Sequence, residues 1–295
     1  MRNRNRLLYS LTGLALLFIL IFSLHLSGRS RRGLAIRSGP TAVTRPAPMP
    51  FPQPAVHLPL PPLSLPRGKG KIAIVLDDWG YTLKQVPALT ALHRPLTVSV
   101  LPNLAHSAEV ARAAQASGHE VILHMPMEAM DPNAPREAGT ILTRMPRREV
   151  IDLMSRSLSA VPSARGINNH QGSKATTDAA LMGIVLQEAK RRGLYFLDSV
   201  VTKQSVCAEV ARRVRIPFAR RSIFLDNELS GPAIQKQVVE LARLAARHGQ
   251  AIGIGHDRTV TLEVLRQAVP ALEKAGYTLV PVSHLTEVQH SQERK

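Results

Sequence analysis

Short apolar runs alternate with amphipathic stretches along the chain from about residue 69 onward. Runs such as KIAIVL (71–76), LTVSVL (96–101) and EVILH (120–124) have the length of buried strands. The stretches between them carry apolar residues at helical spacing, as at 147–161 and 178–193. Strands that alternate with helices form parallel sheets, and seven or eight units over roughly 215 residues predict a (β/α) barrel. A doubly wound open sheet is the alternative.

The pattern is different at the N-terminus, where residues 7–26 contain no Lys, Arg, Asp or Glu. A helix of this length rises about 30 Å, the thickness of a bilayer's hydrocarbon core. A cleaved signal peptide would have a shorter apolar region ending at a small-x-small site, and SLHLSGRSRR offers no good one. We therefore expect residues 1–28 to be a cytoplasmic n-region and a transmembrane signal anchor, with a cleaved signal as the alternative.

A proline-rich segment separates this run from the alternating pattern. Ten prolines fall between Pro40 and Pro66, which predicts an extended spacer without regular pairing. The predicted organisation is an anchor at 1–28, a basic disordered linker at 29–68, a catalytic domain at 69–288 and a polar tail at 289–295.

Composition changes this picture little. The formal net charge of the 295 residues is +17, but residues 1–76 alone hold 11 Lys and Arg and no acid. The remaining chain has no basic stripe with interleaved aromatic residues, so we expect no nucleic-acid partner. A single cysteine, Cys207, excludes an internal disulfide framework and a cysteine-based zinc site.

Polar residues follow nearly every predicted strand. In a parallel barrel the strand ends converge on one rim, where active sites are built. Aspartates and histidines without cysteines suit Zn²⁺ or another first-row divalent ion. The residues at these strand ends are Asp77, Asp78, Asn103, His124, Asn168, Asn169, His170, Asp198, Asp226, His256 and Asp257.

The adjacent carboxylates Asp77 and Asp78 need a positive partner, because like charges at the edge of an apolar layer are costly. A divalent ion would supply it. Neighbouring side chains of a strand point in different directions, so we expect one aspartate to bind the ion and the other to remain a free base. A rim histidine can serve as general acid near neutral pH.

The motifs IVLDDWG, GHEVILHMPME, GINNHQGSKAT, YFLDS and AIGIGHD, in this order, resemble the divergent polysaccharide deacetylases of the NodB-like carbohydrate esterase superfamily. The resemblance implies a distorted (β/α) barrel and metal-dependent removal of acetyl groups from sugars. It further implies that Asp77 is the catalytic base, Asp78 and His124 are metal ligands, and His256 is the general acid.

Two motifs depart from that superfamily. The usual His-x-x-x-His pair is HMPME here, and NNHQG stands in place of Arg-x-Pro-aromatic. The third metal ligand is therefore displaced. Our first choice is His170, whose strand end faces the same rim and whose imidazole preserves an Asp-His-His set. Glu128 is the second choice, since a carboxylate can bind zinc; a solvated loop acid is the alternative for it.

Four further residues are candidates for substrate binding or for supporting the ligands. Asp198 and Asp226 either line the site or cap helices, and Asn169 lies within the NNHQG run. Trp79 either forms an apolar platform for a sugar ring or packs at the corner after the strand.

The expected function is that of a membrane-anchored, metal-dependent deacetylase acting on acetylated cell-envelope polysaccharide or a related glycan. The expected location is the bacterial cytoplasmic membrane, with the catalytic domain on the periplasmic or extracytoplasmic side. One alternative is a barrel that binds a glycan or an envelope protein without turnover. Metal-dependent phosphoester hydrolysis is another, although ligands for only one ion are visible in the sequence.

Overall fold

The computed structural model describes residues 62–288. The strands are β1 Gly70–Trp79, β2 Thr97–Val100, β3 Glu120–Met127, β4 Gly166–Gln171, β5 Tyr195–Asp198, β6 Pro217–Arg220, β7 Ile223–Phe224, β8 Gln250–His256, β9 Tyr277–Leu279 and β10 Glu287–Val288. The helices are α2 Val86–Thr90, α3 Ser107–Ala116, α4 Arg147–Ala160, α5 Ala179–Arg191, α6 Cys207–Val214, α7 Gly231–His248 and α8 Thr259–Lys274, with 3₁₀ turns η1 Ala175–Thr177 and η2 Val282–Leu285.

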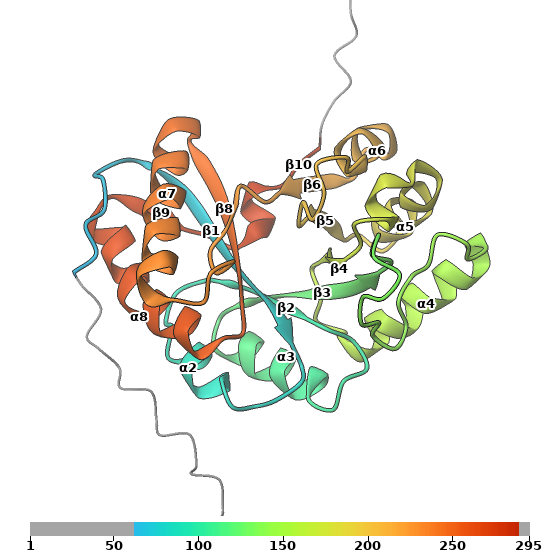
Figure 1. Cartoon of the computed structure of the whole chain (residues 1–295), viewed down its shortest axis with the longest axis horizontal. Helices are drawn as coiled ribbons and strands as arrows, with labels where there is room; N and C mark the ends of the chain where they lie inside the picture. Colours follow the sequence, from blue (N-terminus) through green and yellow to red (C-terminus); the bar gives the residue numbers. More distant parts are fainter. Residues whose placement is uncertain (1–61, 289–295) are drawn as a thin grey trace, which may run out of the picture. The chain divides into compact units, whose positions relative to one another are not determined.

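The strands form one curled sheet in the order β10-β6-β5-β4-β3-β2-β1-β8-β7, with β9 also paired to β1. Strands β1 to β6 lie beside one another in chain order, and β8 returns to the free edge of β1. A doubly wound sheet would instead reverse direction part-way. Only the β10–β6 pair is antiparallel among the described strands. The predicted (β/α) barrel is therefore confirmed as a curled, incompletely closed barrel surrounded by helices (Figure 1).

The core has two layers because both faces of the sheet are covered. Along β1, Ile72 and Ile74 pack with the helices, whereas Ala73 and Val75 face the small cluster inside the curl. Figure 1 shows α7 and α8 (orange) on the outer side of β1 and β9. Burial on both faces explains why KIAIVL is continuously apolar and does not alternate with polar residues.

The folded part begins before the predicted boundary at residue 69. Leu63 and Leu65 pack against the main core, and the Tyr277 hydroxyl donates a hydrogen bond to the Pro66 carbonyl at 3.1 Å. The last part of the proline-rich segment therefore belongs to the domain. No helix within residues 62–288 is long and apolar enough to cross a membrane. The predicted anchor at 7–26, most of the linker and the tail at 289–295 lie outside the described residues.

Candidate active site

The two adjacent aspartates at the end of β1 both face His124. Its Nε2 atom lies 3.7 Å from Asp77 Oδ2 and 3.2 Å from Asp78 Oδ1. A regular strand would send the two side chains to opposite faces. Here the pairing of β1 with β2 shifts register between Leu76 and Trp79, and Asp78 has φ of 67°. This bulge turns both carboxylates toward one point, contrary to the expectation that they diverge.

Asp78, His124 and His170 offer ligand atoms that all lie within 4.8 Å of one another. Asp78 Oδ1 is 3.0 Å from His170 Nδ1, and the two imidazole nitrogens facing it are 3.2 Å apart. Among the described residues no aligned hydrogen-bond donor satisfies this buried oxygen. Three atoms that can each donate a lone pair and that converge on one point are suited to one cation. One carboxylate and two imidazoles are a donor set that first-row divalent ions accept, so the residues fit the implied metal.

A single buried amide orients both the base and a ligand. Asn168 Nδ2 donates to Asp77 Oδ1 at 2.9 Å and to Ser199 Oγ at 3.2 Å. Because a carboxylate only accepts, the amide oxygen must face the other way, where it is 2.6 Å from Ser99 Oγ and 2.8 Å from His124 Nδ1. His124 therefore carries a proton on Nδ1, and its Nε2 faces Asp78 and His170.

The two carboxylates differ electrostatically. Burial raises the pKa of Asp77, and the nearby His124, His256 and Asn168 only partly offset this effect. Burial also raises the pKa of Asp78, but the two neighbouring imidazoles outweigh it and hold that pKa well below its usual range. Asp78 is thus a permanent anion, as a metal ligand should be, whereas Asp77 is a stronger base than an ordinary aspartate.

His256 lies on the strand next to the aspartates, since Asp77 and His256 are paired residues of β1 and β8. Its Nδ1 is 2.8 Å from Asp226 Oδ1, and its backbone N–H donates to Asp226 Oδ2 at 2.7 Å. Thr261 Oγ1 donates to the same Oδ2 at 2.7 Å. Burial lowers the pKa of His256, but the bond to Asp226 and the surrounding carboxylates raise it to about 9. The imidazole is therefore cationic at neutral pH and able to donate a proton.

Arg221 connects the surroundings of the base with those of the acid. Its Nε and Nη2 donate to the carbonyls of Ser199 and Val200 at 2.6 and 2.8 Å. Its guanidinium carbon lies 3.7 Å from the ring centroid of Phe224, and that ring stacks on His256 at 6.1 Å. Ser199 in turn accepts the hydrogen bond from Asn168 described above. The pattern of polar strand ends does not reveal these roles, because they depend on contacts between segments that are distant in the sequence.

The family of the chain follows from its sequence over the same region. The pattern of the divergent polysaccharide deacetylases matches residues 74–286. The chain belongs to the divergent polysaccharide deacetylase family. The uncharacterized protein YibQ of Escherichia coli (strain K12) is 37% identical to it over 223 residues, 76% of this chain and 69% of YibQ. An uncharacterized protein of Haemophilus influenzae is 33% identical over 198 residues, 67% of this chain and 70% of that protein.

A solved structure has a similar fold. The crystal structure of the uncharacterized protein ATU2773 from Agrobacterium tumefaciens C58 superposes with a TM-score of 0.70 at 25% identity. The match covers 77% of this chain and 92% of that chain. The family assignment from the motifs is therefore confirmed, and the distorted barrel that it implied agrees with the curled sheet.

Both carboxylate oxygens of Glu128 are engaged by Thr143 and Lys174. Its Oε2 accepts from the backbone N–H and the hydroxyl of Thr143, both at 2.7 Å, and its Oε1 accepts from Lys174 Nζ at 2.8 Å. Burial alone would raise the pKa of Glu128, but these donors lower it to about 2. His170, and not Glu128, is the third residue of the cluster that Asp78 and His124 form.

Asp198 and Asn169 shape the loop after β5. Asp198 accepts from the Val200 backbone N–H at 2.8 Å and from Ser205 Oγ at 2.7 Å. Asn169 Oδ1 accepts from the Ser199 backbone N–H at 3.0 Å. Both side chains hold the loop that carries Ser199, and neither is among the three clustered ligand residues.

Trp79 does not offer a platform for a sugar. Its side chain is fully buried in the main core, because the bulge that turns the two aspartates toward the site sends the next side chain inward. Of the two roles considered for Trp79, the structure supports packing at the corner after the strand. Asp226, by contrast, is neither a simple cap nor solvent-facing, since it holds the ring and backbone of His256.

Residues with a strained backbone conformation are concentrated at the same rim. Four of the five described non-glycine residues with positive φ lie within three residues of the last residue of a strand: Asp78, Asn103, Gln171 and Val200. Val200, at φ 51°, is β-branched and therefore costly in this conformation. Such residues persist where surrounding contacts fix them, commonly at functional sites. Here Asp198 and Arg221 bind the backbone of Val200 on either side.

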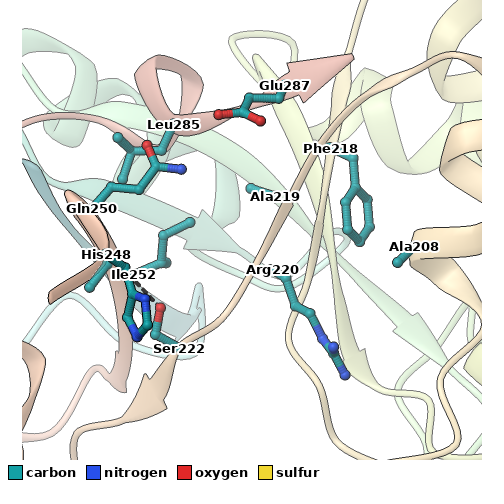
Figure 2. Close-up of a pocket in the computed structure, with 11 residues that line it drawn as sticks. Ala208, Phe218, Ala219, Arg220, Ser222, His248, Gln250, Ile252, Leu285 and Glu287 are labelled. Atoms are coloured by element: carbon teal, nitrogen blue, oxygen red, sulfur yellow. Dashed lines mark hydrogen bonds between the residues drawn. The ribbon is translucent and has the colours of Figure 1, made fainter. Parts of the chain in front are cut away.

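A cavity of about 450 Å³ lies elsewhere, at the open seam of the barrel between β6 and β8. Figure 2 shows its walls, with Phe218 and Arg220 on one side and Gln250 and Ile252 on the other. None of the ligand, base or acid candidates lines it. The candidate chemistry therefore belongs to the rim and not to this cavity.

Proposed function

We propose that this chain is a metal-dependent deacetylase that hydrolyses acetyl groups on a glycan. One observation supports it above the others: Asp77 and His256, the candidate base and acid, are paired on neighbouring strands beside the Asp78, His124 and His170 cluster. Membership of the divergent polysaccharide deacetylase family agrees with a glycan as substrate. Catalysis requires a base and an acid that differ in protonation at one pH, and the opposite environments of these two residues favour that difference.

A divalent ion at Asp78, His124 and His170, with Zn²⁺ as our first choice, would supply a Lewis acid for the acyl oxygen and for an attacking water. Asp78 would remain charged to hold it, and Asn168 would keep Nε2 of His124 available. The identity of the ion rests on the nitrogen-rich donor set, which suits zinc better than magnesium or calcium.

The side chains of this chain would move two protons. Asp77, held by Asn168, accepts a proton from the attacking water as its oxygen bonds to the acetyl carbon. His256, held by Asp226, donates a proton to the departing nitrogen or oxygen as its bond to that carbon breaks. The products are acetic acid, which ionises to acetate in water, and a free amine or hydroxyl on the sugar. Asp77 then releases its proton to solvent and His256 takes one up, so atoms and charge balance over the cycle.

The test of this function is release of acetate from acetylated glycans by the metal-loaded full chain. The matched control is Asp77→Asn, which removes the base but leaves the three ligands. We expect acetate from the parent protein and a loss of at least about 10²-fold in the control. Equal release by both proteins, or none from the parent with metal bound, would reject the proposal.

We also propose that residues 7–26 anchor the protein in the bacterial cytoplasmic membrane, with the folded domain outside the cytoplasm. The charge-free run of membrane-spanning length and the ten prolines after it support this arrangement. Fractionation of the full chain tests it, because an anchored protein sediments with membranes and resists extraction by salt. Recovery of a shortened, freely soluble form would instead indicate signal cleavage.

A further inference from the structure

Positive charge is concentrated at the edge of the sheet where the parallel strands begin, opposite the rim that carries the candidate active site. The helices between the strands run back to this edge, and α5, α6, α7 and α8 each have a lysine or arginine in their last turn. The residues that lead into β1 and β4 add Arg67, Lys69, Lys71 and Arg165, whose side chains are all exposed. We call this surface the amino-end face.

Hydrogen bonds join the start of β1 to the ends of α7 and α8. The Lys71 N–H donates to the carbonyl of Gly249, directly after α7, at 2.9 Å. The Gly68 N–H donates to the carbonyl of Ala275, directly after α8, at 3.1 Å. The exposed cations of these three segments therefore belong to one part of the amino-end face.

The ends of α5 and α6 form the other part of this face together with Arg165. Lys190 Nζ, in the last turn of α5, donates to the carbonyl of Val214, the last residue of α6, at 2.7 Å. Arg165 lines a cavity of about 350 Å³ with Gly193 and Pro217, which follow those two helices. These cations are thus neighbours although they lie far apart in the sequence.

Acidic side chains do not neutralise the amino-end face. Glu188 is buried beneath Arg191 and Arg192, Glu273 pairs with Arg94, and Glu120 accepts a hydrogen bond from the Tyr195 hydroxyl. Glu287, on β10, is an exposed acid near this edge. No ion pair within residues 62–288 involves the four cations that precede or begin the strands, Arg67, Lys69, Lys71 and Arg165.

Stabilisation of helix ends explains only some of this charge. Cations in the last turn of a helix interact favourably with its dipole, which accounts for residues such as Arg247 and Lys274. Arg67, Lys69, Lys71 and Arg165 are in no helix, so this effect does not explain their positions. Unpaired cations that gather on one face instead favour an anionic partner.

The proline-rich segment joins the folded domain at the same face. Leu63 and Leu65 pack against the core, and the segment that follows them enters β1 beside α7 and α8 (blue and orange in Figure 1). Residues 27–61 separate this point from the predicted membrane span, and as an extended polyproline chain they would reach roughly 100 Å. Such a connection keeps the domain near the bilayer without fixing its orientation. Even weak binding by one face would then orient the domain, because its local concentration at the membrane is high.

We propose that the amino-end face binds the anionic phospholipid headgroups of the membrane that anchors the chain, and that this contact turns the active-site rim away from the bilayer. The inference rests on the proposed membrane anchor. Lysines and arginines close to an anionic bilayer are attracted to it, and the attraction is screened by salt. The opposite rim carries the carboxylates Asp77, Asp78 and Asp226, which the same surface repels. Both effects favour one orientation, with the candidate active site open to glycans outside the membrane.

The experiment measures the orientation of the full chain in lipid nanodiscs by energy transfer to dye-labelled headgroups. The donor dye is attached either at Thr278→Cys, exposed on β9 at the amino-end face, or at Ala105→Cys, exposed in the loop after β2 at the rim. The native Cys207 is buried and does not compete for the dye. In discs of equal parts phosphatidylcholine and phosphatidylglycerol, transfer should be strong from position 278 and weak from position 105. Phosphatidylcholine alone, or salt of about 1 M, should remove this difference.

The charge is tested by the combined variant Lys69→Gln, Lys71→Gln and Lys274→Gln, whose side chains are exposed. Each lost cation should weaken the contact about fivefold, so the ratio of oriented to freely turning domains should fall roughly 100-fold. The matched control replaces three exposed cations of the rim loops, Lys84→Gln, Arg144→Gln and Lys203→Gln. It changes the net charge equally and should keep the orientation. Equal melting temperatures of the two variants exclude misfolding as the cause of a loss.

The inference is overturned by equal transfer from positions 278 and 105 in anionic discs, by the same difference in neutral discs, or by equal losses in the two combined variants. If lipid composition has no effect but the first variant loses binding to dextran sulfate, the face serves a soluble acidic polymer and the proposal is rejected. Retention of the full chain in neutral discs tests the anchor separately. A chain that leaves neutral discs but is held in this orientation by anionic ones would reject only the anchor.

Discussion

The Asp226 carboxylate binds His256 twice, through the ring Nδ1 at 2.8 Å and through the backbone N–H at 2.7 Å. One oxygen fixes the ring and the other fixes the end of β8, so the imidazole is held in position as well as charged. Asp226 is itself buried and receives a further bond from Thr261. This pair makes the protonation of His256 depend on one identified carboxylate.

The first prediction is a pH shift in Asp226→Asn. The pKa of His256 is raised to about 9, so acid catalysis should persist at neutral pH and decline only as pH rises through about 9. Removal of the carboxylate charge should lower that pKa toward about 6.5 and move the alkaline limb of kcat to lower pH. Thr261→Val is the control, since it removes a hydrogen bond to Asp226 but keeps the charge. Identical profiles for both variants would contradict the coupling.

The same pair should affect stability. A pKa raised in the folded state stabilises the fold fully below the unfolded value of about 6.5. This contribution is lost as pH rises through about 9. The melting temperature of the parent should therefore exceed that of Asp226→Asn at low pH. This difference in Tm should narrow as the pH rises from the lower to the higher of these two values.

The second prediction separates the roles of the adjacent aspartates. Asp78 Oδ1 faces both histidine nitrogens, whereas Asp77 is held by Asn168 and is farther from His124. Asp78→Asn should lose the divalent ion, while Asp77→Asn should keep it and lose turnover. Metal content by mass spectrometry and acetate release are measured on the same samples. Equal loss of metal in both would mean that the two carboxylates bind the ion together.

The third prediction concerns the choice between His170 and Glu128. His170→Ala should lose metal binding, because it removes one of three converging ligand atoms. Glu128→Gln should keep the metal but lower the free energy of unfolding by about 1–2 kcal/mol, through weaker bonds to Thr143 and Lys174. Metal titration and thermal unfolding distinguish the two. Full metal occupancy in His170→Ala with loss in Glu128→Gln would reverse the assignment.

Much of the fold and part of the site could be predicted from the sequence. Strands buried on both faces are continuously apolar, so β1, β2 and β3 could be located from their composition, and the common direction of parallel strands placed Asp78, His124 and His170 on one rim. These inferences need only the periodicity of the chain. The family resemblance supplied the order of the motifs.

Other features depend on contacts that no local pattern encodes. The left-handed backbone conformation of Asp78 interrupts the usual alternation of side chains along β1. As a result the Asp78 carboxylate faces the site and the Trp79 side chain is buried in the core. The Arg221 guanidinium donates hydrogen bonds to two backbone carbonyls some twenty residues earlier in the chain. A buried asparagine in a strand, Asn168, was the one visible sign of the network, because an amide in a core requires partners.

The fourth prediction tests that asparagine. Asn168→Ala would remove the bonds that hold Asp77 and fix the tautomer of His124, so metal affinity should fall about 10–100-fold and turnover should fall as well. Ser99→Ala removes only one of the bonds to the amide oxygen and should have a much smaller effect on both. Unaltered metal affinity in Asn168→Ala, measured by competition with a chelator, would make the residue purely structural.

The last prediction concerns the leaving group. A protonated His256 matters most when the departing atom is basic, as in an amine or a sugar alkoxide, and matters little for an activated phenolate. Loss of a general acid costs about 10²–10⁴-fold in rate. His256→Ala should therefore lose that factor on acetylated sugars and remain close to the parent on an activated aryl acetate. Its metal content should be unchanged, because Asp78, His124 and His170 remain. Equal losses on both substrates, or loss of the ion, would remove His256 from the role of acid.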